Sequence, residues 1–341
     1  MSEFTLNMRF KKALKGESID MVPVCSVTQT GTVELMEMTG AYWPQANYDA
    51  SKMAALALGG YEIAGFENVR CPFCTTVLAE TLGCTVDEGS VDIQPYVTDF
   101  PCKKKSDVKN ISVPDSLLES RRTSVVLDAV GILKEHVGDD VPVVAGVVGP
   151  AGLASMLAGM KNYLMWFVTN PEVVEELMGT LTEACIEYAN GLLERGADAV
   201  TLIDSEAGPD IIAPEMFEAS VFPLYRKFCR EVNGLKILHM CGDATAVINS
   251  LADAGFEGIS IEEKVSVSFA KRVVGNRVRL IGNVSPSDTL LMKGPDEVMI
   301  EARACLEDGI DILAPGCGLA PHTPLENIKA LFRARNEYCS Q

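Results

Sequence analysis

Three residues of this sequence, one histidine and two cysteines, have the types and spacing of a metal site. His239 and Cys241 are separated by a single residue, and Cys317 lies in a later glycine-rich segment. Imidazole nitrogens and thiolate sulfurs are ligands that zinc prefers. Three protein ligands leave one tetrahedral position open, as in a catalytic rather than a structural zinc site. The pattern therefore predicts a Zn²⁺ ion held by His239, Cys241 and Cys317.

A carboxylate is available for the fourth position. Glu263 follows a short apolar segment that ends at Ile261 and Glu262. Two thiolates and a neutral imidazole balance the charge of Zn²⁺, so a carboxylate makes the site monoanionic. A substrate thiolate that replaces the carboxylate leaves this charge unchanged, which avoids a charge penalty in a site screened from water. We interpret Glu263 as a displaceable fourth ligand; the alternative is a solvated loop glutamate.

Eight short apolar segments alternate with amphipathic helices and predict the scaffold of this site. The predicted strands are residues 22–27, 66–73, 141–148, 198–203, 236–239, 258–261, 278–281 and 310–314. The longer predicted helices include residues 116–137, about 153–166 and 214–232. Such alternation is typical of a parallel sheet, and eight units close into a (β/α)8 TIM barrel. A doubly wound open sheet is disfavoured because no Gly-x-Gly-x-x-Gly turn follows the first strand.

The length suits one TIM-barrel domain over residues 1–341, opened by an N-terminal helix over residues 5–17. Residues 84–115 have no helical period and include the basic run Lys103–Lys105. We predict that they form a small insertion of short strands or loops after the second strand, with the lysines in solvent.

The barrel explains how distant residues can meet, because active sites of this fold lie at the carboxyl ends of the strands. His239 and Cys241 end one predicted strand, and Cys317 follows the last one. Asp204 and Asn283 also stand at strand ends and are predicted to face the same mouth.

A Cys-x-x-Cys pair, Cys71 and Cys74, lies at the end of the second predicted strand. Residues three apart on a strand point to opposite faces, and no second such pair exists to complete a four-cysteine zinc site. We therefore expect Cys74 to line the cavity rather than to act in redox chemistry.

Composition excludes several classes of protein. The net charge is −18, so no basic field exists to attract nucleic acid or an anionic membrane surface. The 11 cysteines and the absence of a signal-peptide pattern favour a cytoplasmic location with reduced thiols. No apolar stretch is long enough to span a membrane. His136 and His322 are predicted to lie at the surface.

The His239-Met240-Cys241 segment with distant Cys317 resembles the His-x-Cys…Cys zinc pattern of the methylcobamide:coenzyme M methyltransferases, a branch of the uroporphyrinogen decarboxylase superfamily. The resemblance covers nearly the whole chain, including residues 311–318 and 323–327. True decarboxylases carry an arginine-rich signature after the first strand, whereas residues 25–31 here contain no arginine. Where the decarboxylases end the second strand in an aspartate, this chain has Phe73-Cys74. Porphyrin decarboxylation is therefore disfavoured.

The resemblance implies a reaction. Zinc binds the thiol of coenzyme M (2-mercaptoethanesulfonate) and lowers its pKa. The sulfur attacks the methyl group of a methylcobamide and yields methyl-coenzyme M and cob(I)amide, a step of methanogenesis. Glu263 or Asp204 can accept the thiol proton.

The resemblance also implies partners. The chain has no Asp-x-His-x-x-Gly corrinoid motif, so a separate methylated corrinoid protein should deliver the corrinoid. A complex with a methanol- or methylamine-specific corrinoid methyltransferase is possible, and overall resemblance favours methanol.

The residues that hold the substrate and cofactor are expected to include Arg70, Cys74 and Asn283. The sulfonate needs a cation or clustered backbone N–H groups. Arg70, Lys264 and the turn at 149–152 are all candidates, and the sequence does not choose among them. Two other functions stay open: a zinc enzyme that alkylates a different thiol such as homocysteine, and a non-catalytic barrel subunit with a closed structural zinc.

Overall fold

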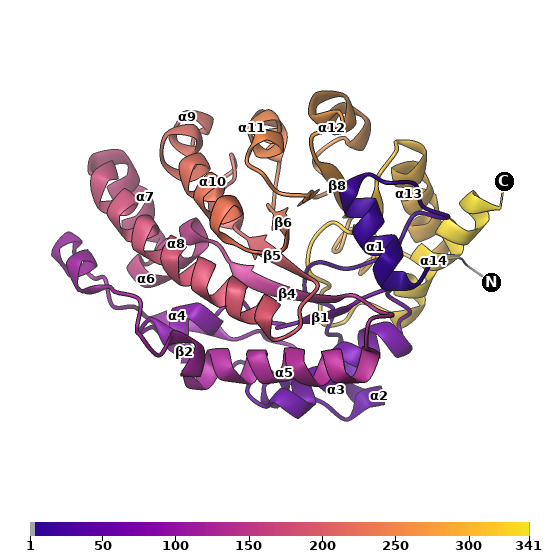
Figure 1. Cartoon of the computed structure of the whole chain (residues 1–341), viewed down its shortest axis with the longest axis horizontal. Coiled ribbons are helices and arrows are strands. Elements are labelled where there is room, and N and C mark those ends of the chain that lie inside the picture. The colour runs from indigo at the N-terminus through magenta and orange to yellow at the C-terminus, as the bar shows by residue number, and fades with distance from the viewer. Residues whose placement is uncertain (1–3, 341) are drawn as a thin grey trace.

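The structure is a computed structural model that describes residues 4–340. Seven parallel strands, ordered β1-β4-β5-β6-β7-β8-β9, curl into the wall of a (β/α)8 barrel (Figure 1). These strands are β1 (Val69–Cys71), β4 (Val143–Val148), β5 (Ala199–Ile203), β6 (Leu235–His239), β7 (Gly258–Ser260), β8 (Arg279–Val284) and β9 (Ile312–Pro315). The predicted fold class is confirmed.

Helices surround the sheet on its outer side (Figure 1). They are α1 (Leu6–Lys15), α2 (Val33–Thr39), α3 (Ala50–Glu62), α4 (Val77–Thr81), α5 (Arg121–Val137), α6 (Pro150–Ala158), α7 (Met160–Thr169), α8 (Pro171–Glu194), α9 (Pro214–Met216), α10 (Phe222–Glu231), α11 (Ile248–Asp253), α12 (Val267–Val274), α13 (Pro295–Glu307) and α14 (Leu325–Cys339). No helix in residues 4–340 is long and apolar enough to cross a membrane.

The first predicted strand, residues 22–27, takes its expected place between β9 and β1 but forms only an isolated bridge, between Val24 and Leu313. Toward β1, side-chain bonds supplement a single backbone bond, from the N–H of Glu67 to the carbonyl of Val24 at 2.9 Å. The N–H of Val24 donates to the Glu67 carboxylate at 3.0 Å, and the N–H of Ser26 donates to the Asn68 side chain at 2.9 Å. The segment therefore closes the barrel without being a regular strand.

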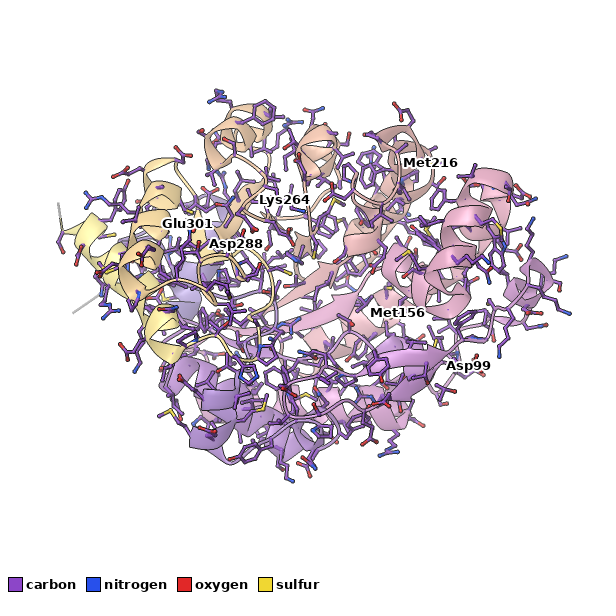
Figure 2. All side chains as sticks on the ribbon, turned by 180° about the vertical axis from the view of Figure 1, so that it is seen from behind. Asp99, Met156, Met216, Lys264, Asp288 and Glu301 are labelled. Atoms are coloured by element: carbon purple, nitrogen blue, oxygen red, sulfur yellow. The ribbon has the colours of Figure 1, made fainter. Side chains whose placement is uncertain are left out.

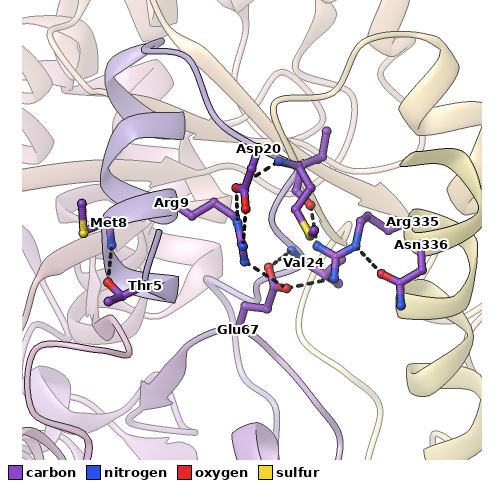
Figure 3. A network of polar contacts seen from close by, with 10 residues as sticks. Thr5, Met8, Arg9, Asp20, Val24, Glu67, Arg335 and Asn336 are labelled. Atoms are coloured by element: carbon purple, nitrogen blue, oxygen red, sulfur yellow. Dashed lines mark hydrogen bonds and ion pairs between the residues drawn. The ribbon is translucent and has the colours of Figure 1, made fainter. Parts of the chain in front are cut away.

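A buried ionic network fixes this closure (Figure 3). The Glu67 carboxylate, which accepts from Val24, lies 2.9 Å from the Arg335 guanidinium of α14 and 3.6 Å from that of Arg9 on α1. Arg9 also pairs with Asp20 at 2.8 Å. Both arginines donate to carboxylates at short range, which compensates for removing their charges from water.

Helix α1 closes the amino end of the barrel and so leaves the carboxyl end as the mouth. Phe10, Ala13 and Leu14 are buried in one apolar cluster with inward residues of the strands, such as Ile237 and Ile281. Thr5 caps the start of the helix, and Gly16 ends it in a left-handed conformation with φ of 68°. The predicted N-terminal helix is thus present as the floor of the barrel.

The insertion also has the predicted character and position. After α4 the chain forms an antiparallel hairpin of β2 (Thr85–Asp87) and β3 (Tyr96–Asp99), and then a 3₁₀ helix, Lys105–Asn110. Lys103 is exposed and pairs with Asp99 at 2.8 Å. Asp99 marks the hairpin at the outer edge of the molecule in Figure 2.

Three long predicted helices are divided differently in the structure. The helix expected over 116–137 begins only at Arg121, because the Ser120 side chain accepts from the N–H of Thr123 and caps it there. The one expected over 153–166 is broken at Gly159, whose φ is 75°. The one expected over 214–232 contains a π-helical turn, Phe217–Val221, just before Pro223, which lacks the N–H for a regular helical bond.

Candidate metal centre and active site

The structure brings His239, Cys241 and Cys317 together at the barrel mouth. Their ligand atoms all lie within 4.8 Å of one another. The Nε2 of His239 is 3.3 Å from the Sγ of Cys241, which is 3.5 Å from the Sγ of Cys317. Zinc bonds of about 2.1 Å to nitrogen and 2.3 Å to sulfur separate tetrahedral ligand atoms by roughly 3.5–3.8 Å. The geometry of the three residues therefore fits zinc.

Neighbouring hydroxyl groups orient this donor set. Ser260 stands opposite His239 in the β6–β7 ladder, and its Oγ is 3.0 Å from the Nδ1 of the histidine. That contact leaves Nε2 on the side of the thiols, as metal-binding histidines require. The Oγ of Ser205 donates to the Sγ of Cys241 at 2.8 Å. Neither serine is among the residues predicted from the sequence. Pairing the ends of the neighbouring strands β6 and β7 would have placed Ser260 beside His239.

The two thiols share a hydrogen bond that shifts their pKa values in opposite directions. The side-chain hydrogen bond with Cys241 lowers the pKa of Cys317 below its usual value. The same bond, followed by burial, raises the pKa of Cys241. The Cys317 thiol thus loses its proton more readily than the Cys241 thiol. A bound cation would hold both sulfurs as thiolates.

Glu263 lies near the loop of Cys317 but is not among the residues whose ligand atoms meet within 4.8 Å. Its Oε2 is buried and has no hydrogen-bond partner within residues 4–340. A Cβ built on Gly316, next to Cys317, would lie 3.2 Å from this oxygen and 3.2 Å from the Cα of Glu262. Gly316 therefore allows the loop after β7 to approach the cysteine loop. An orphaned carboxylate oxygen beside that loop suits a positive ion, because burying it unpaired costs free energy.

A cavity of about 290 Å³ opens on the three residues. Its polar lining includes Thr28, Gln29, Arg70, Cys74 and Gln94. Cys74 lines the cavity as expected. Its Sγ accepts from Arg122 at 3.1 Å and from Thr76 at 3.7 Å. Cys71 is buried outside this lining.

Arg70 is the cation of this cavity. It is only 3% exposed, and no carboxylate pairs with it among the described residues. One guanidinium nitrogen donates to the carbonyl of Pro72, while Nε has no partner there. Burial lowers the pKa of Arg70 to about 10, which still leaves it charged at neutral pH. Gly146 on β4 leaves space for the guanidinium, since a Cβ there would come within 2.2 Å of it.

The other two candidates for an anion-binding role are already engaged. Lys264, labelled in Figure 2, is exposed and pairs with Asp210 at 3.4 Å. It lines a second hollow, which Cys241 also borders, together with Glu206 and Glu262. In the turn at 149–152, the backbone N–H groups of Ala151 and Gly152 donate to a carboxylate of the protein itself, that of Asp204. Arg70 alone of the three lines the cavity that all three metal-ligand candidates border.

Asp204 does not meet the expectation that it faces the mouth. Its side chain is fully buried and points at the start of α6, where it accepts from Gly152 at 2.6 Å and from Tyr225 at 3.0 Å. It is absent from the lining of the cavity. The physical reason is that free N–H groups at a helix start attract the nearest carboxylate.

Asn283 likewise turns away from the cavity. Its amide donates to the carbonyls of Glu262 and Val265, at 3.0 and 2.8 Å, and its oxygen accepts from Cys305. Its NH₂ group is thus directed at the loop that carries Glu263, and its oxygen at α13. Asn283 holds that loop in place instead of contacting a cofactor.

Burial of Asp204 should make stability depend on pH. Burial raises its pKa to about 7 from 3.8, so the folded protein holds a proton that the unfolded chain releases. The folding stability that this bound proton contributes is fully present below pH 3.8 and is lost as the pH rises through about 7. We expect urea unfolding to show that Asp204→Asn gains about 2 kcal/mol relative to wild type between about pH 5 and pH 7. Asp128→Asn, on an exposed residue, is the control; parallel pH curves for wild type and Asp204→Asn would contradict the assignment.

The whole chain matches a known family. The model of the uroporphyrinogen decarboxylase family matches residues 5–338. The chain belongs to this family. Within the uroporphyrinogen decarboxylase family it is similar to the methylcobamide:CoM methyltransferase MtaA of Methanosarcina barkeri, with 47% identity over 99% of each chain. The methylcobamide:CoM methyltransferase MtbA of Methanosarcina acetivorans is 33% identical over 99% of each chain.

A solved structure agrees with this assignment. A methyltransferase from Methanosarcina mazei superposes with a TM-score of 0.96 at 47% identity, covering 98% of this chain and 99% of its own. At this similarity the chain is a methyltransferase of the uroporphyrinogen decarboxylase family.

Proposed function

We propose that this methyltransferase transfers a methyl group from a methylcobamide to the thiol of coenzyme M, producing methyl-coenzyme M and cob(I)amide in methanogenesis. The observation that carries the proposal is a cavity with a His-Cys-Cys donor set and one buried arginine that pairs with no carboxylate in residues 4–340. The chain would act as a single barrel domain. Its 47% identity to a named methylcobamide:CoM methyltransferase supports the same reaction.

The donor set can hold zinc through His239, Cys241 and Cys317. Bound zinc would supply a Lewis acid that lowers the pKa of the substrate thiol, so that a thiolate is present at neutral pH. The substrate sulfur would then form a bond to the methyl carbon while the cobalt–carbon bond breaks. The electron pair of the broken bond would remain on cobalt. Ser205 and Ser260 keep the cysteine and the histidine in orientation during this exchange.

Arg70 would bind the sulfonate. Coenzyme M is a two-carbon thiol with an anionic tail, and the guanidinium is the buried cation of the cavity. A planar guanidinium matches the oxygens of a sulfonate with parallel hydrogen bonds. The acidic hollow around Lys264 repels the same tail.

The methyl donor would be a methylated corrinoid protein. A cavity of about 290 Å³ accepts a small thiol, whereas a corrin macrocycle has to lie across the mouth. A complex with a methanol- or methylamine-specific corrinoid methyltransferase would reload that carrier. We favour methanol, and reconstitution with each carrier in turn would decide between them.

The activity can be tested with free methylcobalamin as donor. We expect one zinc per chain and methyl transfer to coenzyme M that exceeds transfer to homocysteine. X-ray absorption should report one additional sulfur at the metal when coenzyme M binds. A metal-free protein, or four protein ligands that persist with the thiol present, would contradict the proposal.

Glu263 is proposed as the ligand that the substrate replaces. In Glu263→Gln we expect substrate-free zinc to lose one oxygen ligand, and the zinc affinity to fall by about 10-fold, because a neutral amide is a weaker ligand than a carboxylate. X-ray absorption and competition with a chelator measure both effects. Glu262→Gln makes the same charge change one residue away and is the control. Unaltered zinc coordination in Glu263→Gln would refute this role.

A further inference from the structure

The hairpin insertion contributes a side chain to the cavity. Gln94 lies between β2 and β3 and lines the cavity together with Cys241 and Cys317. The preceding residues of the hairpin turn, 87–93, are not part of that lining. A segment without helical or strand period in the sequence thus reaches the candidate active site.

Two unpartnered polar groups in the cavity lining are open to a ligand. Of the side chains that line the cavity, only Arg70, through its Nε, and Gln94, through its Oε1, carry a buried polar atom without a hydrogen-bond partner within residues 4–340. Gln29, the other glutamine of the lining, is fully engaged: its amide donates to Leu319 and its oxygen accepts from Gly31. An unpaired buried polar group costs free energy, which a ligand that pairs with it would recover.

The position of Gln94 is fixed by the hairpin. The N–H of Gly89 donates to Asp87 at 2.9 Å, and that of Ser90 donates to the carbonyl of Ile93 at 2.9 Å. Gly89 has a φ of 76°, and a Cβ there would lie 2.1 Å from the Ile93 oxygen, so the turn requires glycine. This internal bracing fixes the backbone that carries the Gln94 side chain.

The hairpin tip is also attached to the loop that carries a metal ligand. Asp92 lies 3.5 Å from the Nε2 of His322, and Pro321 in the same loop lines the cavity. That loop begins after β9 and contains Cys317. The hairpin and the cysteine loop therefore form two joined walls of one cavity.

We propose that Gln94 is a substrate-binding residue that, with Arg70, hydrogen-bonds the anionic tail of the thiol substrate. This inference rests on the proposed function for the nature of the substrate. A carboxamide has a donor end and an acceptor end, and its two orientations are interchangeable in the absence of a partner. The NH₂ end donates to a sulfonate oxygen while the sulfur lies toward Cys241 and Cys317. The insertion is then a specificity element and not a passive loop.

The test compares two thiols that differ only in their tails. Coenzyme M and 2-mercaptoethanol are titrated calorimetrically into zinc-loaded protein. We expect Gln94→Ala to raise the Kd of coenzyme M by about 10-fold, since hydrogen bonds to charged groups contribute about 1.5–3 kcal/mol. Gln94→Glu, of the same shape, should raise it further because its carboxylate repels a sulfonate. The Kd of 2-mercaptoethanol should stay within about twofold in both variants.

Thr98→Ala is the matched control, because it removes a hydrogen bond inside the hairpin, to Thr85 at 3.2 Å, without touching the cavity. Equal weakening of both thiols, or an unchanged Kd for coenzyme M, would overturn the role of Gln94. Binding is measured without a methyl donor, so a failure of methyl transfer would refute the proposed function while leaving this result readable. Thermal unfolding of each variant separates a lost contact from a lost fold.

Discussion

Cys317→Ala should remove both the metal and the activity. Loss of residues that merely support a metal ligand costs about 10–100-fold in affinity or rate, so loss of a ligand itself should reduce methyl transfer to coenzyme M by more than about 100-fold. The remaining pair, His239 and Cys241, would hold zinc through two bonds. We expect the bound zinc, measured by elemental analysis after dialysis, to fall well below one ion per chain.

Cys229→Ala is the control for this experiment. Cys229 is partly buried like Cys317 but lies on α10, away from the cavity. It should retain zinc and activity. If Cys317→Ala kept its full zinc content and rate, the donor set proposed here would have to be abandoned.

Arg70→Met should weaken coenzyme M binding by about 30–5000-fold. Truncating one partner of a buried, hydrogen-bonded charge pair typically costs about 2–5 kcal/mol. The KM for 2-mercaptoethanol should change little, because a hydroxyl tail does not need a guanidinium. Steady-state kinetics with both thiols measure this difference.

Stability provides an independent check on Arg70. A buried charge without a carboxylate partner is unfavourable in the free protein. Arg70→Met should therefore be as stable as wild type or more stable in urea. Lys264→Met, which removes an exposed cation, should leave both KM values near those of wild type. A loss of stability together with equal effects on both thiols would mean that Arg70 is structural.

The sequence was sufficient for the barrel and for the group of three metal-binding candidates. Strand ends of a parallel barrel meet at one mouth, so assigning β6 and β9 already implied that His239, Cys241 and Cys317 converge. The period of the apolar residues carries that information, and it does not depend on details of side-chain packing.

The direction of individual side chains at strand ends was not accessible in the same way. Asp204 and Asn283 stand at the predicted positions, yet Asp204 binds the start of α6 and Asn283 binds the loop after β7. Each choice depends on which donor or acceptor lies nearest in three dimensions. For the same reason Gln94 escaped notice, since a non-periodic insertion gives no sign of which residue it turns inward.

Residues far apart in the sequence meet at the first predicted strand, which has a consequence for how the barrel folds. Arg335 donates to the carbonyl of Val22 at 2.7 Å, across a sequence separation of 313 residues, and also holds the carboxylate that receives the N–H of Val24. Val22 and Val24 thus gain these partners only after α14 has left the ribosome. Contacts so distant in sequence also slow folding. We therefore expect the nascent barrel to remain open at this seam until α14 is available.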